Sequence, residues 1–396
     1  MRFAFNEDQE ALRASAHSFL ADHSSPADVR KAMATEAGYD PELWRRIAAE
    51  LGWTSITVPE QYGGLGLTFV ELVGLMEEMG GVLLCAPFFS TICLAATALL
   101  VGGTEAQKQE YLPPIVGGDT TATLAHTEPI GRWDAAAIEL QAARNGGDFI
   151  LNGTKTFVVD GHTANLLVVT ARRDGSRAQE GVSVFAVPAD TAGVARRLLP
   201  TMDQTRKLAE ITFSDARLPA SALLGEEGAG WPIVSRTLDL AAIALAAEQV
   251  GGAQRCLDMS VQYAKERIQF GRPIGSFQAI KHKCADMMLR VESARSASYY
   301  AGWAASVDDP EVPVLASLAK AYCSDAYFAC AAESVQIHGG VGFTWEYDVH
   351  LHFKRAKSSE VLLGDPSYHR ELVAQRIGLG RNQGSRVQGL EGSRDG

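Results

Sequence analysis

The sequence has few of the features that mark a secreted disulfide protein or a membrane protein. None of its six cysteines forms a C-x-x-C pair, and cysteines scattered through apolar segments predict reduced core residues; they are Cys85, Cys93, Cys256, Cys284, Cys323 and Cys330. No apolar run reaches the roughly 20 residues of a membrane span. Charged residues appear near the start before any apolar stretch, unlike a signal peptide. We therefore expect a cytoplasmic protein.

Positive charge is also scarce. Lys and Arg number 36 against 47 Asp and Glu, which gives a net charge of -11 and argues against a nucleic-acid or anionic-membrane partner. A metal site is not expected, because His350 and His352 point to different sides of a helix and no cysteine joins them or His338. The partners expected are small molecules and other subunits.

The chain has 396 residues, and 46% of them are hydrophobic. This length and apolar content allow more than one hydrophobic core. Residues 1–121 have helical periodicity with glycine and proline punctuation. The expected helices there are at 8–20, 41–51, 68–79, 90–101 and 105–115. Residues 122–227 are β-rich, with turn clusters between the expected strands, which are at 149–151, 166–170, 182–187 and 210–213.

Residues 228–380 return to long helical segments that suit an antiparallel bundle; these are at 233–269, 274–307, 313–338 and 365–377. Residues 381–396 are rich in glycine and charge and are predicted to be a flexible tail. The order of helices, then strands, then helices predicts an α+β chain of three domains.

The most informative segment is Arg267 to Gln278, which reads Arg-Ile-Gln-Phe-Gly-Arg-Pro-Ile-Gly-Ser-Phe-Gln. A guanidinium beside an aromatic ring suits the pyrophosphate and ring of a dinucleotide. The same residues also fit an ordinary helix C-cap, in which Gly271 adopts the left-handed conformation and Pro273 prevents the helix from continuing. This segment alone does not decide between the two interpretations.

Three further motifs accompany it: Leu51 to Gly66, Thr127-Glu128-Pro129, and Gln336 to Phe343. Together and in this order, the four motifs resemble the acyl-CoA dehydrogenase family, from about residue 5 to residue 377. The resemblance implies an N-terminal helical domain, a middle β-barrel or sandwich and a C-terminal four-helix bundle. It also implies an FAD enzyme that oxidises an acyl-CoA to its trans-2-enoyl-CoA and passes electrons to an electron-transfer flavoprotein.

The resemblance further implies which residues meet the FAD. Those on the side of a neighbouring subunit are Arg267, Gln269, Phe270, Gln278, Gln336, Ile337, Gly339 and Gly340. On the chain's own side, Thr127 would face the pyrimidine edge of the flavin. Phe157 stands where the family commonly has a tryptophan, and Val159 where it usually has a hydroxyl. Substrate contacts fall on Trp133 and Asp239.

The catalytic base of the family is missing at both of its usual places. The reaction needs a carboxylate that removes the Cα proton of the thioester. The usual position is Leu363, in Leu362-Leu363-Gly364-Asp365, and the alternative position is Ala241, followed by Ala242 where an arginine is expected. The loop at residues 130–134 also carries large groups, including Trp133, in place of small ones.

Three hypotheses follow from these departures. The first is a subunit of an α2β2 heterotetramer whose sister chain carries the base, as in some actinobacterial dehydrogenases for steroid side-chain CoA esters. The second is a self-sufficient dehydrogenase, which in this family is usually a homotetramer, with Glu248 as a relocated base about two turns after Ala241 and a pKa raised by burial. Glu346 and Asp365 are lesser candidates for this base, and the pathway expected for the enzyme is the oxidation of fatty acids or of steroid side chains. The third is a flavin monooxygenase or oxidase on the same fold. The acyl chain and the activity of the chain alone stay open.

Overall fold

The computed structural model describes residues 5–379, so the predicted tail at residues 381–396 lies outside the described part. Six helices form the N-terminal unit: α1 (Glu7–His23), α2 (Pro26–Met33), α3 (Pro41–Ala49), α4 (Phe69–Gly81), α5 (Thr97–Gly102) and α6 (Glu105–Val116). The five expected helical regions are present, and α2 is an addition. Sequence reasoning passed over α2 although Ser25 caps it and Pro26 occupies its first turn, a common helix start.

The segment predicted as a helix at 90–101 has an unusual geometry. It begins as a π-helix at Phe89–Ala96, all of it buried, and continues as α5. The Thr97 hydroxyl donates to the Ile92 carbonyl at 3.0 Å. π-helical turns are rare in proteins and often occur near functional sites.

The middle unit is one sheet with the strand order β6-β7-β3-β2-β4-β5-β8, and β1 pairs in parallel with β4. The four expected strands lie within β3 (Asp148–Val159), β4 (Leu166–Arg172), β5 (Val182–Pro188) and β7 (Leu208–Leu218). The short strands β1 (Ala122–Ala125), β2 (Gln141–Asn145), β6 (Val194–Leu199) and β8 (Leu223–Leu224) were not predicted. Their length gives too few residues for a clear alternation.

The C-terminal unit is built on three long antiparallel helices, α7 (Trp231–Glu266), α8 (Gln278–Ser306) and α9 (Val312–His338). The shorter helices α10 (Val349–Val361) and α11 (Pro366–Arg376) pack on α9. The prediction that the first long helix runs to residue 269 is wrong, because α7 ends at Glu266 and a small β-hairpin follows. This hairpin is β9 (Ile268–Gln269) and β10 (Arg272–Pro273).

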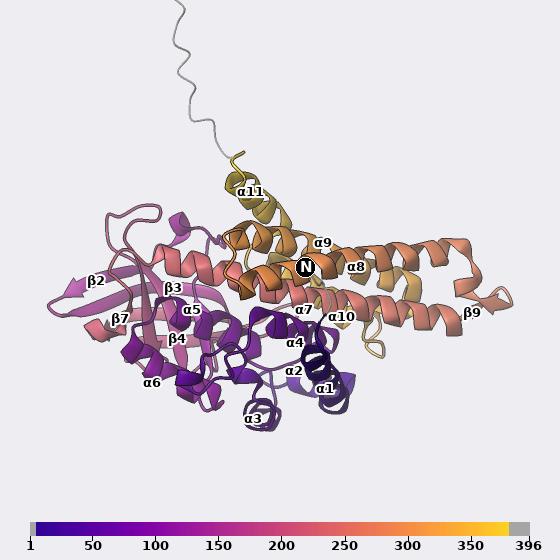
Figure 1. The fold of residues 1–396 in the computed structure, drawn as a ribbon, viewed down its shortest axis with the longest axis horizontal. Coiled ribbons are helices and arrows are strands. Elements are labelled where there is room, and N and C mark those ends of the chain that lie inside the picture. Colours follow the sequence, from indigo (N-terminus) through magenta and orange to yellow (C-terminus); the bar gives the residue numbers. More distant parts are fainter. Residues whose placement is uncertain (1–4, 380–396) are drawn as a thin grey trace, which may run out of the picture.

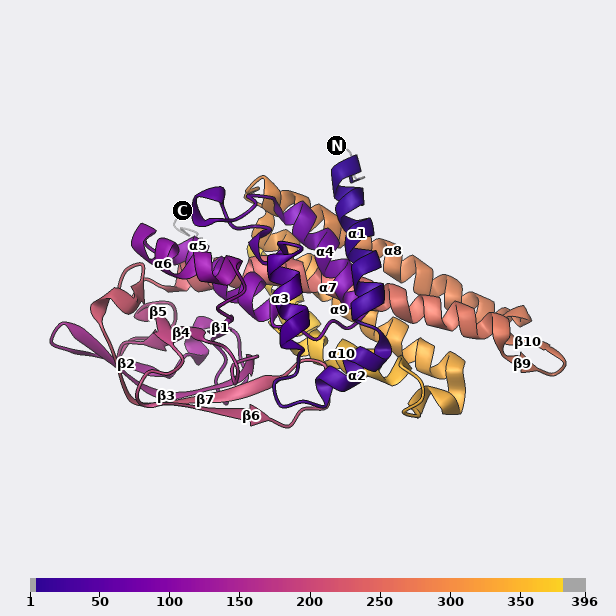
Figure 2. The ribbon, with the colours of Figure 1, turned by 90° about the horizontal axis from the view of Figure 1, so that it is seen from below.

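The three units lie side by side along the molecule. Figure 1 shows the sheet at one end, the N-terminal helices against the middle of α7, and the α7–α8 hairpin projecting at the other end. Figure 2 shows α1, α3 and α4 on one side of α7 and the strands beside them. One large core joins α4, α7 and α9 with the strand end at Val159, whereas the sheet has a second core around Phe149 and Phe185.

All six cysteines are free thiols, and five of them are buried. Among residues 5–379, no helix is long and apolar enough to cross a bilayer.

Candidate functional site

The largest cavity near the expected active site lies between the sheet unit and the helical bundle. It has a volume of about 960 Å³ and is lined by the loop around Trp133, by the first turns of α7 and by α11. Leu363 and Asp239 both face it. The structure therefore brings together the expected base position and the two predicted substrate contacts, Trp133 and Asp239.

Leu363 lies in the turn that connects α10 to α11. Its φ is 63°, an unusual value for a leucine, and its side chain is 3% exposed. The imidazole of His369 donates to the Leu363 carbonyl at 3.0 Å, which fixes this turn. A leucine held here places a hydrocarbon side chain on the cavity wall and no group that can accept a proton.

Asp239 is the one buried carboxylic acid among the residues lining this cavity. Burial raises its pKa to about 6, although the Arg376 guanidinium opposes the shift. Arg376 Nη2 lies 2.9 Å from Oδ1 and 3.2 Å from Oδ2 of Asp239. The acid is thus held in one orientation by α11, with a pKa high enough for it to exchange protons near neutral pH.

The hypothesis that Glu248 is a relocated base is corrected by its contacts. Glu248 is 5% exposed, and its carboxylate lies 2.5 Å from Arg206 and 2.9 Å from Arg355. Burial alone would raise its pKa, but the two guanidinium charges outweigh burial and lower it. The prediction of a raised pKa is therefore wrong. Glu248 also does not line the Leu363 cavity.

Glu248 belongs instead to a buried ionic group that we call the Arg355 cluster, made of Asp203, Thr205, Arg206, Glu248 and Arg355. Arg355 is 2% exposed, and its guanidinium donates to Asp203 at 2.9 Å, to Glu248 at 2.9 Å and to the Thr205 hydroxyl at 2.6 Å. The acids raise its pKa against the effect of burial. The cluster ties the connection between β6 and β7 of the middle unit to α7 and α10.

The alternative base position is also buried and separated from the Leu363 cavity. Ala241 and Ala242 are buried at 0% and 1% exposure in the core between α4, α7 and α9. Neither side chain lines the Leu363 cavity.

The Thr127-Glu128-Pro129 motif builds the loop that carries Trp133. The Glu128 carboxylate accepts hydrogen bonds from Lys155 Nζ at 2.6 Å and from the backbone N–H groups of Glu139 and Leu140 at 2.9 and 3.0 Å. These bonds close the loop between residues 128 and 140 onto β3. The glutamate of the motif therefore has a structural role in this chain.

Trp133 is packed rather than free. Its ring stacks with His126 at 5.8 Å between centroids, and its carbonyl accepts from the His126 imidazole at 3.1 Å. Burial lowers the pKa of His126 to about 3, so this ring is neutral. Trp133 takes up space on the sheet side of the cavity that a small residue would leave open.

The predicted flavin contacts on the chain's own side differ in accessibility. Phe157 is 45% exposed with φ of 54°, at a register irregularity between Lys155 and Val158 that turns its ring outward, as β-bulges do. Thr127 and Val159 are only 4% and 3% exposed. Each of these two side chains therefore offers only a small surface to a cofactor.

The predicted FAD contacts on the side of a neighbouring subunit are mostly exposed to solvent. In the hairpin after α7, Phe270 and Gly271 both have positive φ, 52° and 76°, as a tight two-residue turn requires. Phe270 is 91% exposed. Arg267, Gln269 and Gln278 are exposed as well, and the Arg267 side chain has no hydrogen-bond or ion-pair partner within residues 5–379. Gly271 thus serves the hairpin turn and not a helix cap.

The end of α9 lies beside this hairpin. The Tyr263 ring stacks on His338 at 4.3 Å between centroids, so the last turns of α7 and α9 are in contact. Gln336, Gly339 and Gly340 are exposed, and a Cβ built on either glycine would meet nothing within 4 Å. Ile337 is 5% exposed and packs into the bundle. We call Arg267 to Gln278 with Gln336 to Gly340 the hairpin end.

The hairpin end fits part of a dinucleotide site. A guanidinium without a partner, an exposed ring and open glycine backbone are the groups that bind a pyrophosphate and a flat ring system. Figure 1 places this end far from the sheet that carries Phe157 and Thr127. One chain therefore cannot bring both sets of predicted contacts to the same cofactor molecule.

Several residues of the Leu363 cavity escaped sequence reasoning, namely Trp231, Tyr368, His369 and Arg376. An arginine near a helix end is usually assigned to the helix dipole, so nothing in the sequence indicates that Arg376 pairs with Asp239. The histidines considered for a metal have other contacts: His352 Nδ1 lies 3.0 Å from the Tyr327 hydroxyl, and His350 Nδ1 lies 2.8 Å from the Tyr347 carbonyl.

Comparisons with known proteins match most of the chain. Residues 6–119, 123–216 and 228–378 match the N-terminal, middle and C-terminal domains of acyl-CoA dehydrogenase. Acyl-CoA dehydrogenase IpdE2 of Mycolicibacterium smegmatis is 35% identical over 361 residues, 91% of this chain and 96% of the relative.

Two solved structures are similar throughout. Butyryl-CoA dehydrogenase from Megasphaera elsdenii has a TM-score of 0.90 and 31% identity, over 95% of this chain and 100% of the other. The ChsE4-ChsE5 complex from Mycobacterium tuberculosis includes a chain with a TM-score of 0.86 and 29% identity, over 95% of this chain and 99% of that one.

Proposed function

The chain belongs to the acyl-CoA dehydrogenase family and is an FAD-dependent oxidoreductase of that family; from this premise we propose that it acts as the base-lacking subunit of a heteromeric enzyme. The observation that carries the proposal is the contrast between Leu363, a hydrocarbon at the expected base position, and the open hairpin end. The chain retains groups that suit a partner's cofactor and lacks the carboxylate for its own.

In this proposal the hairpin end reaches a sister subunit. Arg267 would hold the pyrophosphate of the partner's FAD, Phe270 would pack on the cofactor, and Gly339 and Gly340 would let backbone N–H groups approach. FAD, when bound there, would supply the acceptor for the hydride that leaves Cβ of the acyl-CoA. The sister subunit supplies the carboxylate that removes the Cα proton.

Heteromeric assembly has a parallel among the similar structures, because the ChsE4-ChsE5 structure is a complex of two chains. The same proposal includes an α2β2 arrangement and an electron-transfer flavoprotein as the electron acceptor. It also includes the CoA ester of a steroid side chain or of a fatty acid as the substrate. The domain limits at residues 1–121, 122–227 and 228–380 belong to it as well.

The test is purification of the chain alone and together with a sister dehydrogenase subunit that carries the family's base. The chain alone is expected to bind FAD substoichiometrically and to show no flavin bleaching with a panel of acyl-CoAs under anaerobic conditions. Co-expression is expected to give a stable complex, stoichiometric FAD and turnover. Full FAD content and turnover by the single chain would disprove the proposal.

A second candidate is a self-sufficient dehydrogenase with Asp239 as the base. It is favoured by one observation: Asp239 is the buried carboxyl of the Leu363 cavity, with a pKa raised to about 6 by burial. Under this alternative the single chain bleaches its flavin with acyl-CoA, and Asp239→Asn abolishes the reaction while FAD stays bound. Bleaching at the wild-type rate by the Asn variant would exclude Asp239.

A further inference from the structure

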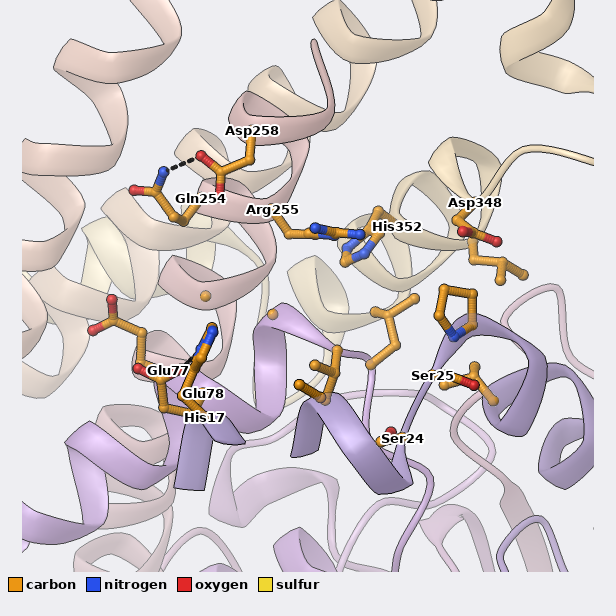
Figure 3. Close-up of a pocket in the computed structure, with 18 of the residues that line it drawn as sticks. His17, Ser24, Ser25, Glu77, Glu78, Gln254, Arg255, Asp258, Asp348 and His352 are labelled. Carbon is orange, nitrogen blue, oxygen red and sulfur yellow. Dashed lines mark hydrogen bonds and ion pairs between the residues drawn. The ribbon is translucent and has the colours of Figure 1, made fainter. Parts of the chain in front are cut away.

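A second cavity lies on a different part of the molecule. It has a volume of about 500 Å³ and is bordered by α1, α2 and α4 on one side and by α7, α8 and α10 on the other (Figure 3). It shares no lining residue with the Leu363 cavity. Acyl-CoA oxidation as proposed above makes no use of it.

The glutamates of this cavity already have partners. Glu77 accepts from Arg295 at 3.0 Å and from the Tyr299 hydroxyl at 2.5 Å. Glu78 accepts from Arg13 at 3.0 Å. This charge network closes one end of the cavity and leaves neither Arg13 nor Arg295 without a counter-charge.

The two aspartates are also engaged. Asp348 pairs with Arg30 at 2.8 Å, and Asp258 accepts from Gln254 at 2.8 Å. Arg255 is different: in the described part of the chain its guanidinium has neither an ion pair nor a hydrogen bond. Figure 3 shows the Arg255 side chain directed toward His352 at the cavity. Arg255 is thus the lining cation with an unused hydrogen-bonding fork.

His352 provides a second, buried polar group. It is 3% exposed, and burial together with the charges of Arg255 and Arg355 lowers its pKa to about 3, so the ring is neutral. Its Nδ1 lies 3.0 Å from the Tyr327 hydroxyl. When this hydroxyl donates to Nδ1, Nε2 carries the hydrogen, and it has no partner among residues 5–379.

Ser24 is a further polar residue of the lining. It is 4% exposed, and its hydroxyl has no partner within the described residues although it lines the cavity. Figure 3 shows Arg255 and His352 close together and Ser24 on the opposite side of the cavity. The guanidinium and the imidazole N–H are therefore the pair that can hold one oxyanion.

The rest of the lining limits the kind of anion. Val29, Leu83 and Leu351 supply apolar walls, whereas Asp258 and Asp348 keep positive charge from accumulating. One negative charge with a short hydrocarbon body matches this lining better than a doubly charged phosphate. We infer that the cavity binds a free monocarboxylate, with the carboxylate on Arg255 and His352 Nε2 and the hydrocarbon against Val29, Leu83 and Leu351.

The test is isothermal titration of the full chain with hexanoate, hexanol and inorganic phosphate. Hexanoate is expected to bind at one site per chain, and hexanol and phosphate about tenfold more weakly or not at all. Arg255→Gln is expected to weaken hexanoate binding about tenfold or more, because a charge-assisted pair is lost.

Arg45→Gln is the matched control, since it removes an exposed arginine of α3 whose partner is Glu42 and which does not line the cavity. It is expected to leave hexanoate binding unchanged. The unfolding midpoint of Arg255→Gln should equal that of the wild type, because the side chain has no intramolecular partner to lose.

Three results would overturn the inference. Hexanoate binding that survives Arg255→Gln would belong to another place, such as the Leu363 cavity. Equal affinity for hexanol or phosphate would remove the requirement for a monocarboxylate. No binding of hexanoate at millimolar concentration would leave the cavity without this ligand. None of these outcomes bears on FAD content or heteromer formation, so the two proposals fail independently.

Discussion

Arg355 and Arg267 use the same side chain in opposite ways. Arg355 is 2% exposed and has partners on the middle unit and on α7, whereas Arg267 is exposed on the hairpin end without a side-chain partner among residues 5–379. A buried arginine is tolerated only when its charge and its donors are matched within the chain. An exposed, unmatched arginine next to an exposed ring costs the fold little and remains available to a ligand or another subunit. Whether an arginine has a counter-charge within the chain therefore distinguishes a residue that stabilises the fold from a residue that is available to a ligand or another subunit.

The strongest test of this comparison removes the buried charge. Arg355→Ala leaves Asp203 and Glu248 with fewer partners in a space that excludes water, and we expect a loss of about 3–5 kcal/mol in the free energy of unfolding. Urea unfolding followed by fluorescence measures it. A loss below about 1 kcal/mol would mean that the Arg355 cluster is hydrated and does not tie the units together.

Glu248→Gln tests the same cluster from the acidic side. The variant keeps the shape but leaves Arg206 and Arg355 short of a negative charge, so we expect a loss of about 3 kcal/mol in unfolding free energy. In the assembled enzyme, the rate of flavin reduction by acyl-CoA should change less than about threefold. A drop of several orders of magnitude at unchanged stability would restore Glu248 as the base.

Asp239 lies between the two extremes, since it is buried but has one guanidinium partner. Its pKa is about 6 in the folded chain, raised by burial from an ordinary value of 3.8. The folded state therefore holds this proton more tightly than the unfolded state, and stability falls as pH rises from about 4 to about 6, by roughly 2–3 kcal/mol. Comparing unfolding free energies of wild type and Asp239→Asn over this range isolates the slope, which the Asn variant should lack. Parallel curves for the two proteins would contradict the raised pKa.

Arg267→Ala should have the smallest effect on the fold. We expect a change within about 0.5 kcal/mol in unfolding free energy, as for other exposed substitutions. In the complex with the sister subunit, FAD affinity should fall about tenfold or more through the loss of a charge-assisted contact. Fluorescence titration of the apo complex with FAD measures the change, with Arg45→Ala as the control. Unchanged FAD affinity would separate the hairpin end from the cofactor.

Much of this arrangement follows from local sequence. Caps and helical periodicity locate most helices, the turn residues locate the main strands, and four ordered motifs indicate the family. Phe270-Gly271 illustrates the limit, since both the helix cap and the hairpin turn use a left-handed glycine. The two structures are distinguished only by the pairing of the strands on either side of the turn, β9 and β10.

Long-range charge pairing could not be predicted. Arg355 contacts Asp203 across 152 positions and Glu248 across 107, and α10 itself was not expected as a separate helix. Without Arg355, burial was the only effect that sequence reasoning could assign to Glu248, and burial alone gives the wrong sign for its pKa. The pairing of Asp239 with Arg376 escaped for the same reason. Sequence patterns show which faces are apolar, but not which distant charges meet between them.

The Arg355 cluster also sets an order of events during synthesis. Asp203 leaves the ribosome 152 residues before Arg355, and at about 5–20 residues per second that delay is roughly 8–30 s. During this time Asp203 lacks its guanidinium partner and Glu248 has only Arg206, so we expect the middle unit and α7 to stay undocked until α10 emerges. Protease digestion of nascent chains stalled before and after α10 would detect the change. Docking of the middle unit onto α7 would then depend on the last tenth of the described chain, which contains α10.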